Sequence, residues 1–180
     1  NNKIEITFNT KGAVVEKAVI KNYVGHDIKK KDGSNDKKDV TLFDSSEQSL
    51  NYTLTAKEVN INTGDLYFPT SGVTDSTVTF TAQAGQGKTI SLKYVLGKDY
   101  MLHMEMSAQG MAGLFAPNTQ NMDVNWKDKA RQQERGFSFE NRYATLTYHK
   151  TEGGTDYLNE SKENIDKSIE KKIDWVAFKN

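Results

Sequence analysis

Histidine and carboxylate side chains could act as acids, bases or metal ligands, but few of them are clustered in this sequence. The three histidines are His26, His103 and His149, and no two have a spacing typical of a metal site. His103 and Glu105 alternate on one predicted strand, so they share a face and could in principle act as an acid/base pair. A solvent-facing strand pair explains the same spacing, and catalysis needs a further constellation that the sequence does not show. We therefore expect no catalytic residue, metal ligand or cofactor.

A sugar platform is the other chemistry that these residue types could support. The aromatic rings of Tyr52, Tyr67, Phe68 and Trp126 could line one, but aromatics at alternating positions of a β-sandwich are mostly core residues. The sequence contains no nucleophile-elbow, P-loop or dinucleotide-binding motif. Cysteine is absent, which excludes disulfides, thiol nucleophiles and cysteine-ligated metals. Binding is therefore a better hypothesis than catalysis.

The composition fits one well-solvated domain. The 180 residues carry 24 basic and 24 acidic side chains, so no net field attracts nucleic acid or anionic lipid. No run of 18 apolar residues occurs, so the sequence predicts no transmembrane helix within it. We expect residues 1–180 to form a single β-sandwich domain, since the length suffices for a core without disulfides or metals.

Alternation of apolar and polar residues predicts the strands that must position any site. It recurs in short segments separated by turn residues, which is typical of an antiparallel sandwich. Beyond the first two strands, around Ile4 to Phe8 and Val14 to Ile20, these segments are Val40 to Phe43, Leu50 to Ala56, Thr77 to Gln83, Lys88 to Leu96, Tyr100 to Ala108, Phe137 to Glu140 and Ala144 to His149. The same alternation predicts a buried set of Ile4, Ile6, Phe8, Val19, Leu54, Phe80, Leu92, Tyr94, Leu102 and Met104.

The sequence also predicts three turns between strands, one loop and one helix. Ala84 to Gly87 and Gly97 to Asp99 are short enough for hairpin turns, and a third turn is expected at Gly153-Gly154. Lys29 to Asp39 is expected to be a solvated loop, because its five lysines alternate with three aspartates. Ser161 to Lys172 is predicted to be a short helix, with Ser161 as its N-cap.

The two ends of the sequence suggest a longer parent protein. The last residues, from Ile173 to Asn180, form an apolar strand with no turn or polar tail after it, and the first residues run straight into a strand. We expect this domain to have been excised from a longer chain.

Four segments together resemble the periplasmic domain of the YidC family of membrane-protein insertases. The resemblance spans the whole chain in the order of the family, and the last segment is its most specific part. The segments are Gly12 to Tyr23, Tyr94 to Leu102, Trp126 to Lys150 and Asp174 to Lys179.

The resemblance implies a twisted antiparallel β-supersandwich, similar to galactose mutarotases, with a short C-terminal helical region. Kinship of fold does not transfer mutarotase activity. By the same resemblance, the chain is a non-catalytic accessory and interaction domain at the periplasmic side of the bacterial inner membrane. The parent would insert and fold inner-membrane proteins, alone or with the Sec translocon, so Sec accessory subunits and nascent membrane proteins are the implied partners. The membrane is implied as a neighbour only through absent flanking transmembrane segments.

Two alternatives remain open at this stage. One is a carbohydrate-binding module or sugar epimerase of the same sandwich fold, with His103 and Glu105 as its candidate pair. The other is a secreted adhesion domain with no membrane neighbour.

The insertase hypothesis makes the C-terminal strand a membrane-proximal exit segment. We expect this segment to consist of Trp175, Val176, Ala177 and Phe178, with Trp175 packed on the sandwich so that the chain leaves in a fixed direction.

Overall fold

Strand is the main class of secondary structure in the computed structural model, which describes residues 1–25, 28–29, 35–36, 39–57, 59–117, 121–133, 136–159, 169 and 171–179. Every strand pair in these ranges is antiparallel. The prediction of a mostly β, antiparallel fold is confirmed, while the specific likeness to galactose mutarotases stays a prediction. Within the same ranges, no helix has both the length and the apolar character needed to cross a bilayer.

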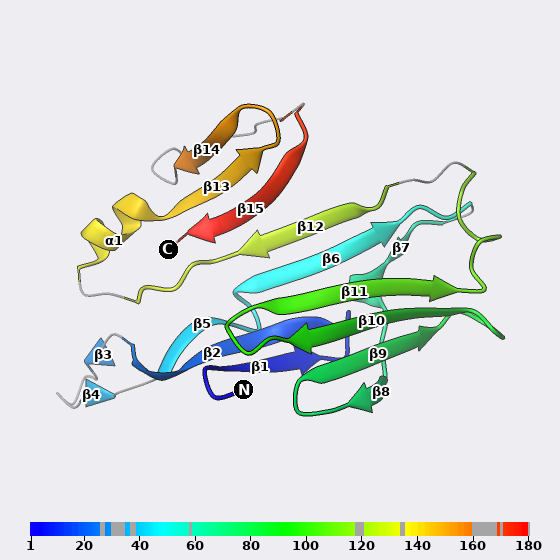
Figure 1. Ribbon diagram of the computed structural model, residues 1–180, viewed down its shortest axis with the longest axis horizontal. Coiled ribbons are helices and arrows are strands. Elements are labelled where there is room, and N and C mark those ends of the chain that lie inside the picture. The colour runs from blue at the N-terminus through cyan, green and yellow to red at the C-terminus, as the bar shows by residue number, and fades with distance from the viewer. Residues whose placement is uncertain are drawn as a thin grey trace.

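Residues up to Gln109 supply all strands of two sheets and a short ribbon (Figure 1). The N-terminal sheet has the order β1-β2-β5, with β1 at Ile4–Asn9, β2 at Val14–Val24 and β5 at Asp39–Asp44. The four-stranded sheet has the order β11-β10-β9-β8, with β8 at Thr70–Val73, β9 at Thr77–Gln83, β10 at Thr89–Leu96 and β11 at Leu102–Gln109. The ribbon pairs β3 (Ile28–Lys29) with β4 (Asn35–Asp36).

Two further sheets complete the fold. The middle sheet has the order β12-β6-β7, with β6 at Gln48–Leu54, β7 at Ile61–Asn62 and β12 at Asp123–Asp128. The C-terminal sheet has the order β14-β13-β15, with β13 at Thr145–Lys150, β14 at Gly154–Asn159 and β15 at Ile173–Lys179. The helical elements are the 3-10 turn η1 (Thr63–Asp65) and the helix α1 (Phe137–Tyr143).

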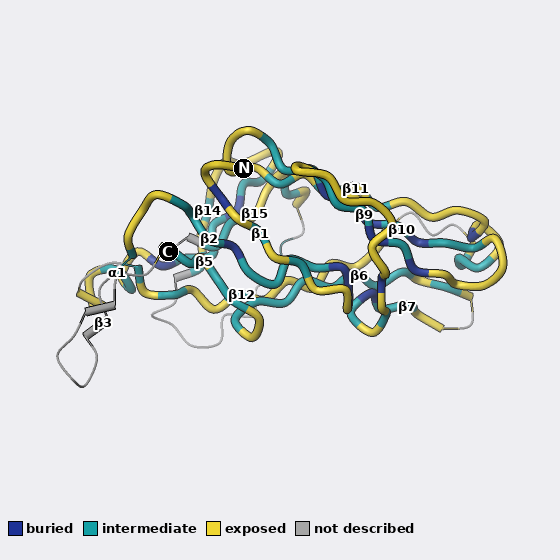
Figure 2. The backbone as a smooth tube through the Cα atoms, turned by 90° about the horizontal axis from the view of Figure 1, so that it is seen from below, coloured by how far each residue is buried: buried dark blue, intermediate teal, exposed yellow. Residues whose placement is uncertain are grey.

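The main core lies where the four-stranded sheet stacks on the middle sheet (Figure 2). Antiparallel pairing sets Phe80 opposite Leu92 and Ala82 opposite Ile90, so these side chains share one face of the sheet. Burial of each large apolar side chain contributes about 1.5–3 kcal/mol, so this face accounts for much of the stability. The buried residues of the cluster are Ala13, Tyr52, Phe68, Phe80, Ala82, Ile90, Leu92, Tyr94 and Met111.

Three aromatic rings join the N-terminal sheet to this core. Phe8 of β1 packs against Phe80 and Tyr94, with ring centroids 5.6 and 4.8 Å away. The rings of Phe80 and Tyr94 meet edge to face, with centroids 6.2 Å apart. The Tyr94 hydroxyl then donates a buried hydrogen bond of 2.7 Å to the carbonyl oxygen of Ala13. Tyr94 therefore holds the turn between β1 and β2 by packing and by a directional bond.

The turn that receives this bond has an uncommon backbone. Gly12 and Ala13 have φ angles of +78° and +52°, in the left-handed region. Glycine adopts this region freely, whereas a residue with a Cβ loses roughly 1–2 kcal/mol there. Ala13 is fully buried, and hydrogen bonds of 2.8 Å from Gly12 N–H to the Leu66 carbonyl and from Phe68 N–H to the Thr10 carbonyl flank the turn. The surrounding contacts therefore hold the strained conformation in place.

The hairpins predicted around Ala84 to Gly87 and Gly97 to Asp99 are confirmed, as are the turn at Gly153-Gly154 and a strand at the C-terminal end. The strand predicted at Phe137 to Glu140 is wrong, because these residues begin helix α1. The pattern Phe-Ser-Phe-Glu alternates apolar and polar residues as a strand does. Four residues are too few, however, to distinguish the period of a strand from that of a helix.

The predicted buried set is confirmed for four of its ten residues. Ile4, Phe80, Leu92 and Tyr94 are buried. The side chains of Phe8, Leu54, Leu102 and Met104 are half-buried against the core, and Ile6 is also half-buried. Val19 is half-buried too, and it pairs with Glu5 on the face opposite to buried Ala18. Full burial was therefore predicted wrongly for these six residues.

Two sequence predictions fall largely outside the described residues. Most of the loop expected at Lys29 to Asp39 and of the helix expected at Ser161 to Lys172 is not described.

Removal of the Tyr94 hydroxyl tests the bond to Ala13. Tyr94→Phe keeps the ring contacts but leaves the buried Ala13 carbonyl without this donor, so we expect a loss of about 1–2 kcal/mol in the free energy of unfolding. Urea denaturation followed by circular dichroism measures the change. Tyr67→Phe is the control, since Tyr67 is 69% exposed. Equal stability of the two variants would show that the bond contributes nothing.

Candidate functional site

The His103–Glu105 pair lies on the solvent side of β11. Both side chains are exposed, with Val95 and Lys93 as their cross-strand neighbours on β10. Leu102, Met104 and Met106 alternate with them and are half-buried. The prediction that both side chains face solvent on one strand is confirmed.

His149 makes contacts typical of a structural residue. Its Nδ1 lies 3.2 Å from Oδ2 of Asp174, and the hydroxyl of Thr151 donates a hydrogen bond of 2.6 Å to Oδ1 of the same carboxylate. The Thr151 bond, with a further contribution from His149, lowers the pKa of Asp174. The group joins β13 to β15 at an exposed surface. His26 lies outside the described residues, and within the described ranges no three His, Asp or Glu side chains gather as metal ligands do.

The four candidate platform aromatics do not form one surface. Tyr52 and Phe68 are buried in the core, whereas Tyr67 is exposed. Trp126 of β12 packs edge to face on Phe178 of β15, with centroids 4.6 Å apart. These positions do not make a shared sugar platform.

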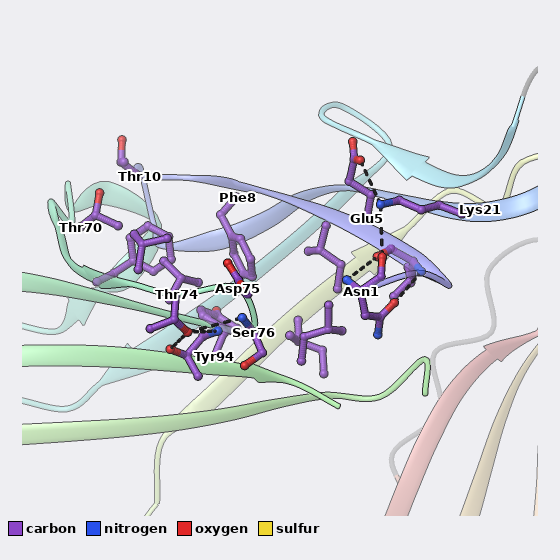
Figure 3. A pocket seen from close by; sticks show the side chains of 18 residues that line it. Asn1, Glu5, Phe8, Thr10, Lys21, Thr70, Thr74, Asp75, Ser76 and Tyr94 are labelled. Carbon is purple, nitrogen blue, oxygen red and sulfur yellow. Dashed lines mark hydrogen bonds and ion pairs between the residues drawn. The ribbon is translucent and has the colours of Figure 1, made fainter. Parts of the chain in front are cut away.

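A cleft of about 420 Å³ lies between β1 and the four-stranded sheet. Figure 3 shows Phe8 and Tyr94 in its middle, with Asn1 and Lys21 toward one end and Thr10 and Thr70 toward the other. Its apolar wall includes the side chains of Ile4, Ile6, Phe8, Val78, Phe80, Tyr94, Leu96 and Leu102. Because burial raises the pKa of Tyr94, its hydroxyl stays neutral and adds no charge to this wall. The cleft therefore suits an apolar ligand.

Polar contacts lie at one end of the cleft and in the turn beside its middle (Figure 3). Asn1 Nδ2 donates hydrogen bonds of 2.8 and 2.9 Å to the carbonyls of Gly97 and Asp99, in the turn between β10 and β11. At the β8–β9 turn, the hydroxyls of Thr74 and Thr77 lie 2.7 Å apart, and Thr74 N–H donates to the Thr77 carbonyl. The Asn1 bonds join the start of the chain to the four-stranded sheet, whereas the Thr74–Thr77 bonds lie within one turn of that sheet.

β1 lines this cleft and is an edge strand of the N-terminal sheet. Lys21 N–H donates to the Lys3 carbonyl, and Ile4 uses its N–H to bond Asn1 Oδ1 instead of β2. Antiparallel pairing alternates these directions, so the N–H and C=O of Ile6 point away from β2. Sequence reasoning missed the cleft, because its walls come from residues more than 90 positions apart.

The exit segment forms a paired strand. β15 pairs with β13, which sets Trp175 opposite His149 and Phe178 opposite Leu146. Trp175 is 46% exposed and stacks on the His149 ring, with centroids 5.8 Å apart. The expectation that Trp175 packs on the sandwich as a buried anchor is therefore wrong. Phe178 makes that contact instead, through Trp126. Val176 is exposed and Ala177 half-buried.

A second hollow, of about 310 Å³, separates the end of β12 from α1. Its lining includes Asp128, Phe137, Glu140 and Ala144. Burial, with a smaller contribution from Glu47, raises the pKa of Asp128. Helix α1 therefore stands off β12 instead of packing tightly on it.

The stacked antiparallel sheets and the apolar cleft define a β-sandwich domain with a surface suited to binding. Comparison with known proteins then identifies the family: the model of the YidC periplasmic domain matches residues 1–180, and the chain belongs to that family.

Relatives carry the same identification. The chain is similar to proteins named membrane protein insertase YidC from Phocaeicola vulgatus, with 41% identity, Bacteroides fragilis, with 39%, and Porphyromonas gingivalis, with 32%. Each match covers 100% of this chain and 28% of the relative. The chain therefore spans little more than a quarter of these proteins. No solved structure matches it significantly.

The contact between Trp126 and Phe178 can be measured with a double-mutant cycle. We expect a coupling of about 0.5–1.5 kcal/mol between Trp126→Ala and Phe178→Ala, as for other edge-to-face aromatic pairs. Trp175→Ala is the comparison, and it should cost clearly less than the roughly 3–5 kcal/mol of a buried tryptophan. Additive effects of Trp126→Ala and Phe178→Ala would contradict this account of how β15 is held.

Proposed function

We propose that residues 1–180 form one domain of a longer membrane-protein insertase and act there as a non-catalytic interaction module at the periplasmic side of the inner membrane. Family membership over the whole chain carries this proposal, together with the insertase names of relatives that are more than three times as long. The solvent-facing His103–Glu105 pair is consistent with a non-catalytic role.

The substrate class follows from the cleft. A membrane protein that leaves a translocation pathway exposes apolar side chains and unpaired backbone groups. The wall around Phe8 and Tyr94 offers contact to the apolar side chains. The backbone of Ile6, on the edge of β1, offers hydrogen bonds to the unpaired backbone groups. We assign the cleft to extended apolar segments of nascent membrane proteins.

Two further assignments rest on the family resemblance. Sec accessory subunits are the proposed protein partners. The exit segment, Trp175 to Phe178, is proposed to lead toward the membrane part of the parent. Its support is the pairing of β15 with β13 and the Phe178–Trp126 contact, which together fix the direction of the strand.

Photo-crosslinking at adjacent residues of β11 tests the cleft. A photoreactive amino acid replaces Leu102, which lines the cleft, or His103, which faces solvent on the same strand. In the full-length protein, we expect adducts with a ribosome-bound nascent chain of a defined inner-membrane protein from position 102 and few from 103. Equal adducts at both positions, or none at 102, would contradict the assignment.

A carbohydrate assay tests the non-catalytic assignment. We expect the purified domain not to accelerate galactose mutarotation in polarimetry, because His103 and Glu105 are exposed strand residues whose cross-strand neighbours are Val95 and Lys93. Sugar turnover that is lost in His103→Ala or Glu105→Ala, with folding retained, would replace the insertase-domain proposal with the enzyme alternative.

A further inference from the structure

Helix α1 exposes aromatic side chains that a helix would ordinarily bury. Phe137, Phe139 and Tyr143 are 62%, 66% and 51% exposed, and α1 has no buried residue. A surface helix of a globular protein usually turns its apolar stripe toward the core. Here the three large apolar residues of a seven-residue helix point outward instead.

Two of these rings contact each other on the outside, whereas Phe137 lies roughly 200° away around the helix axis from Phe139 and lines the hollow beside β12. Phe139 and Tyr143 are one helical turn apart, and their rings meet edge to face with centroids 5.4 Å apart. Phe137 stands at the start of the helix, at the mouth of the hollow beside β12. Exposed Arg142 directly precedes Tyr143 in the last turn of the helix. We call Phe137, Phe139 and Tyr143 the α1 aromatic cluster.

Polar contacts outside the cluster hold α1 in place. Gln133 N–H donates a 2.6 Å hydrogen bond to Glu140 Oε1, and Gln133 Nε2 donates a 2.8 Å bond to the Thr41 carbonyl of β5. Glu140 therefore connects α1 through Gln133 to the N-terminal sheet. The aromatic cluster is not needed for this attachment, and its side chains remain available for an external contact.

The position of α1 indicates what that contact is. Figures 1 and 2 both place α1 beside the C-terminal end of β15, at the same end of the molecule. If β15 leads toward the membrane, as proposed above, α1 lies at the end of the domain nearest the bilayer. Phenylalanine and tyrosine flanked by arginine are typical of the membrane–water interface, where rings enter the headgroup region and the cation meets phosphate.

A second copy of this chain is a less suitable partner than the bilayer for the exposed aromatic side chains of α1. A seven-residue helix is roughly 10 Å long, and a stable dimer buries about 800 Å² on each partner. Three side chains on one turn and a half of helix cover only part of such an area.

We propose that α1 is a membrane-contact element, whose aromatic cluster rests in the interfacial layer of the bilayer when the parent holds the domain at the membrane. This proposal rests on the proposed exit direction of β15. Three side chains provide little affinity by themselves, so the contact orients a tethered domain instead of recruiting a free one.

The absence of cysteine makes a site-specific test simple. Phe139→Cys, labelled with a polarity-sensitive fluorophore, reports on the cluster. Val73→Cys is the matched control, an equally exposed apolar residue at 70% on edge strand β8. Each protein is tethered by a C-terminal hexahistidine tag to phosphatidylcholine–phosphatidylglycerol vesicles that contain nickel-chelating lipid.

We expect the label at position 139 to shift to shorter wavelength and to be quenched by spin-labelled lipid, and the label at 73 to do neither. With a reporter at Tyr143→Cys, the double change Phe137→Ser and Phe139→Ser should abolish the quenching. Circular dichroism should show a folded protein, because neither phenylalanine is buried.

Other results would overturn the proposal. The tethering is repeated with the hexahistidine tag at the N-terminus. If the label at position 139 shifts with neither tag, a membrane contact is excluded. If the labels at 73 and 139 are quenched equally, the protein adsorbs to the vesicles unspecifically. A concentration-dependent shift without vesicles identifies a second copy as the occupant. Quenching at 139 from an N-terminal tag but not from the C-terminal tag keeps the lipid contact and removes the proposed exit direction. Crosslinking at Leu102 tests the cleft independently.

Discussion

The structure depends on the docking of β1 onto the four-stranded sheet. The ring of Phe8 packs against Phe80 and Tyr94, and the Tyr94 hydroxyl bonds the carbonyl of Ala13 at the turn after β1. A buried carbonyl without a donor costs about 1–3 kcal/mol, and left-handed Ala13 costs a further 1 kcal/mol or so. One tyrosine therefore satisfies the carbonyl and helps to hold the strained turn.

The same contact creates the cleft. A strand that paired fully with the four-stranded sheet would close the space, but β1 touches it through side chains and leaves one backbone edge open. Asn1, bonded to the β10–β11 turn, keeps the far end of β1 from moving away. The apolar wall and the free edge are thus two consequences of one packing arrangement.

Alternation predicted the sheets well where a strand has one buried and one solvent face. β9, β10 and β11 have that character, so their hairpins and inward residues were predictable. β12 was missed, because its sequence Asp-Val-Asn-Trp-Lys-Asp is mostly exposed and carries little apolar signal. The cleft was missed for another reason, since register and packing bring Ile6, Val78 and Leu102 together and no local pattern records that.

The error at Trp175 shows how strand parity decides which aromatic becomes an anchor. Size alone favoured tryptophan, the larger apolar residue. Pairing with β13, however, sets Trp175 beside exposed His149, whereas Phe178 shares a face with Leu146 and buried Tyr148. Because residues 175 and 178 differ by an odd number, they cannot face the same side of β15. Packing of Phe178 on Trp126 therefore turns Trp175 outward. The stacked Trp175 and His149 rings then lie on the outer face of the C-terminal sheet, while the opposite face holds β15 against β12.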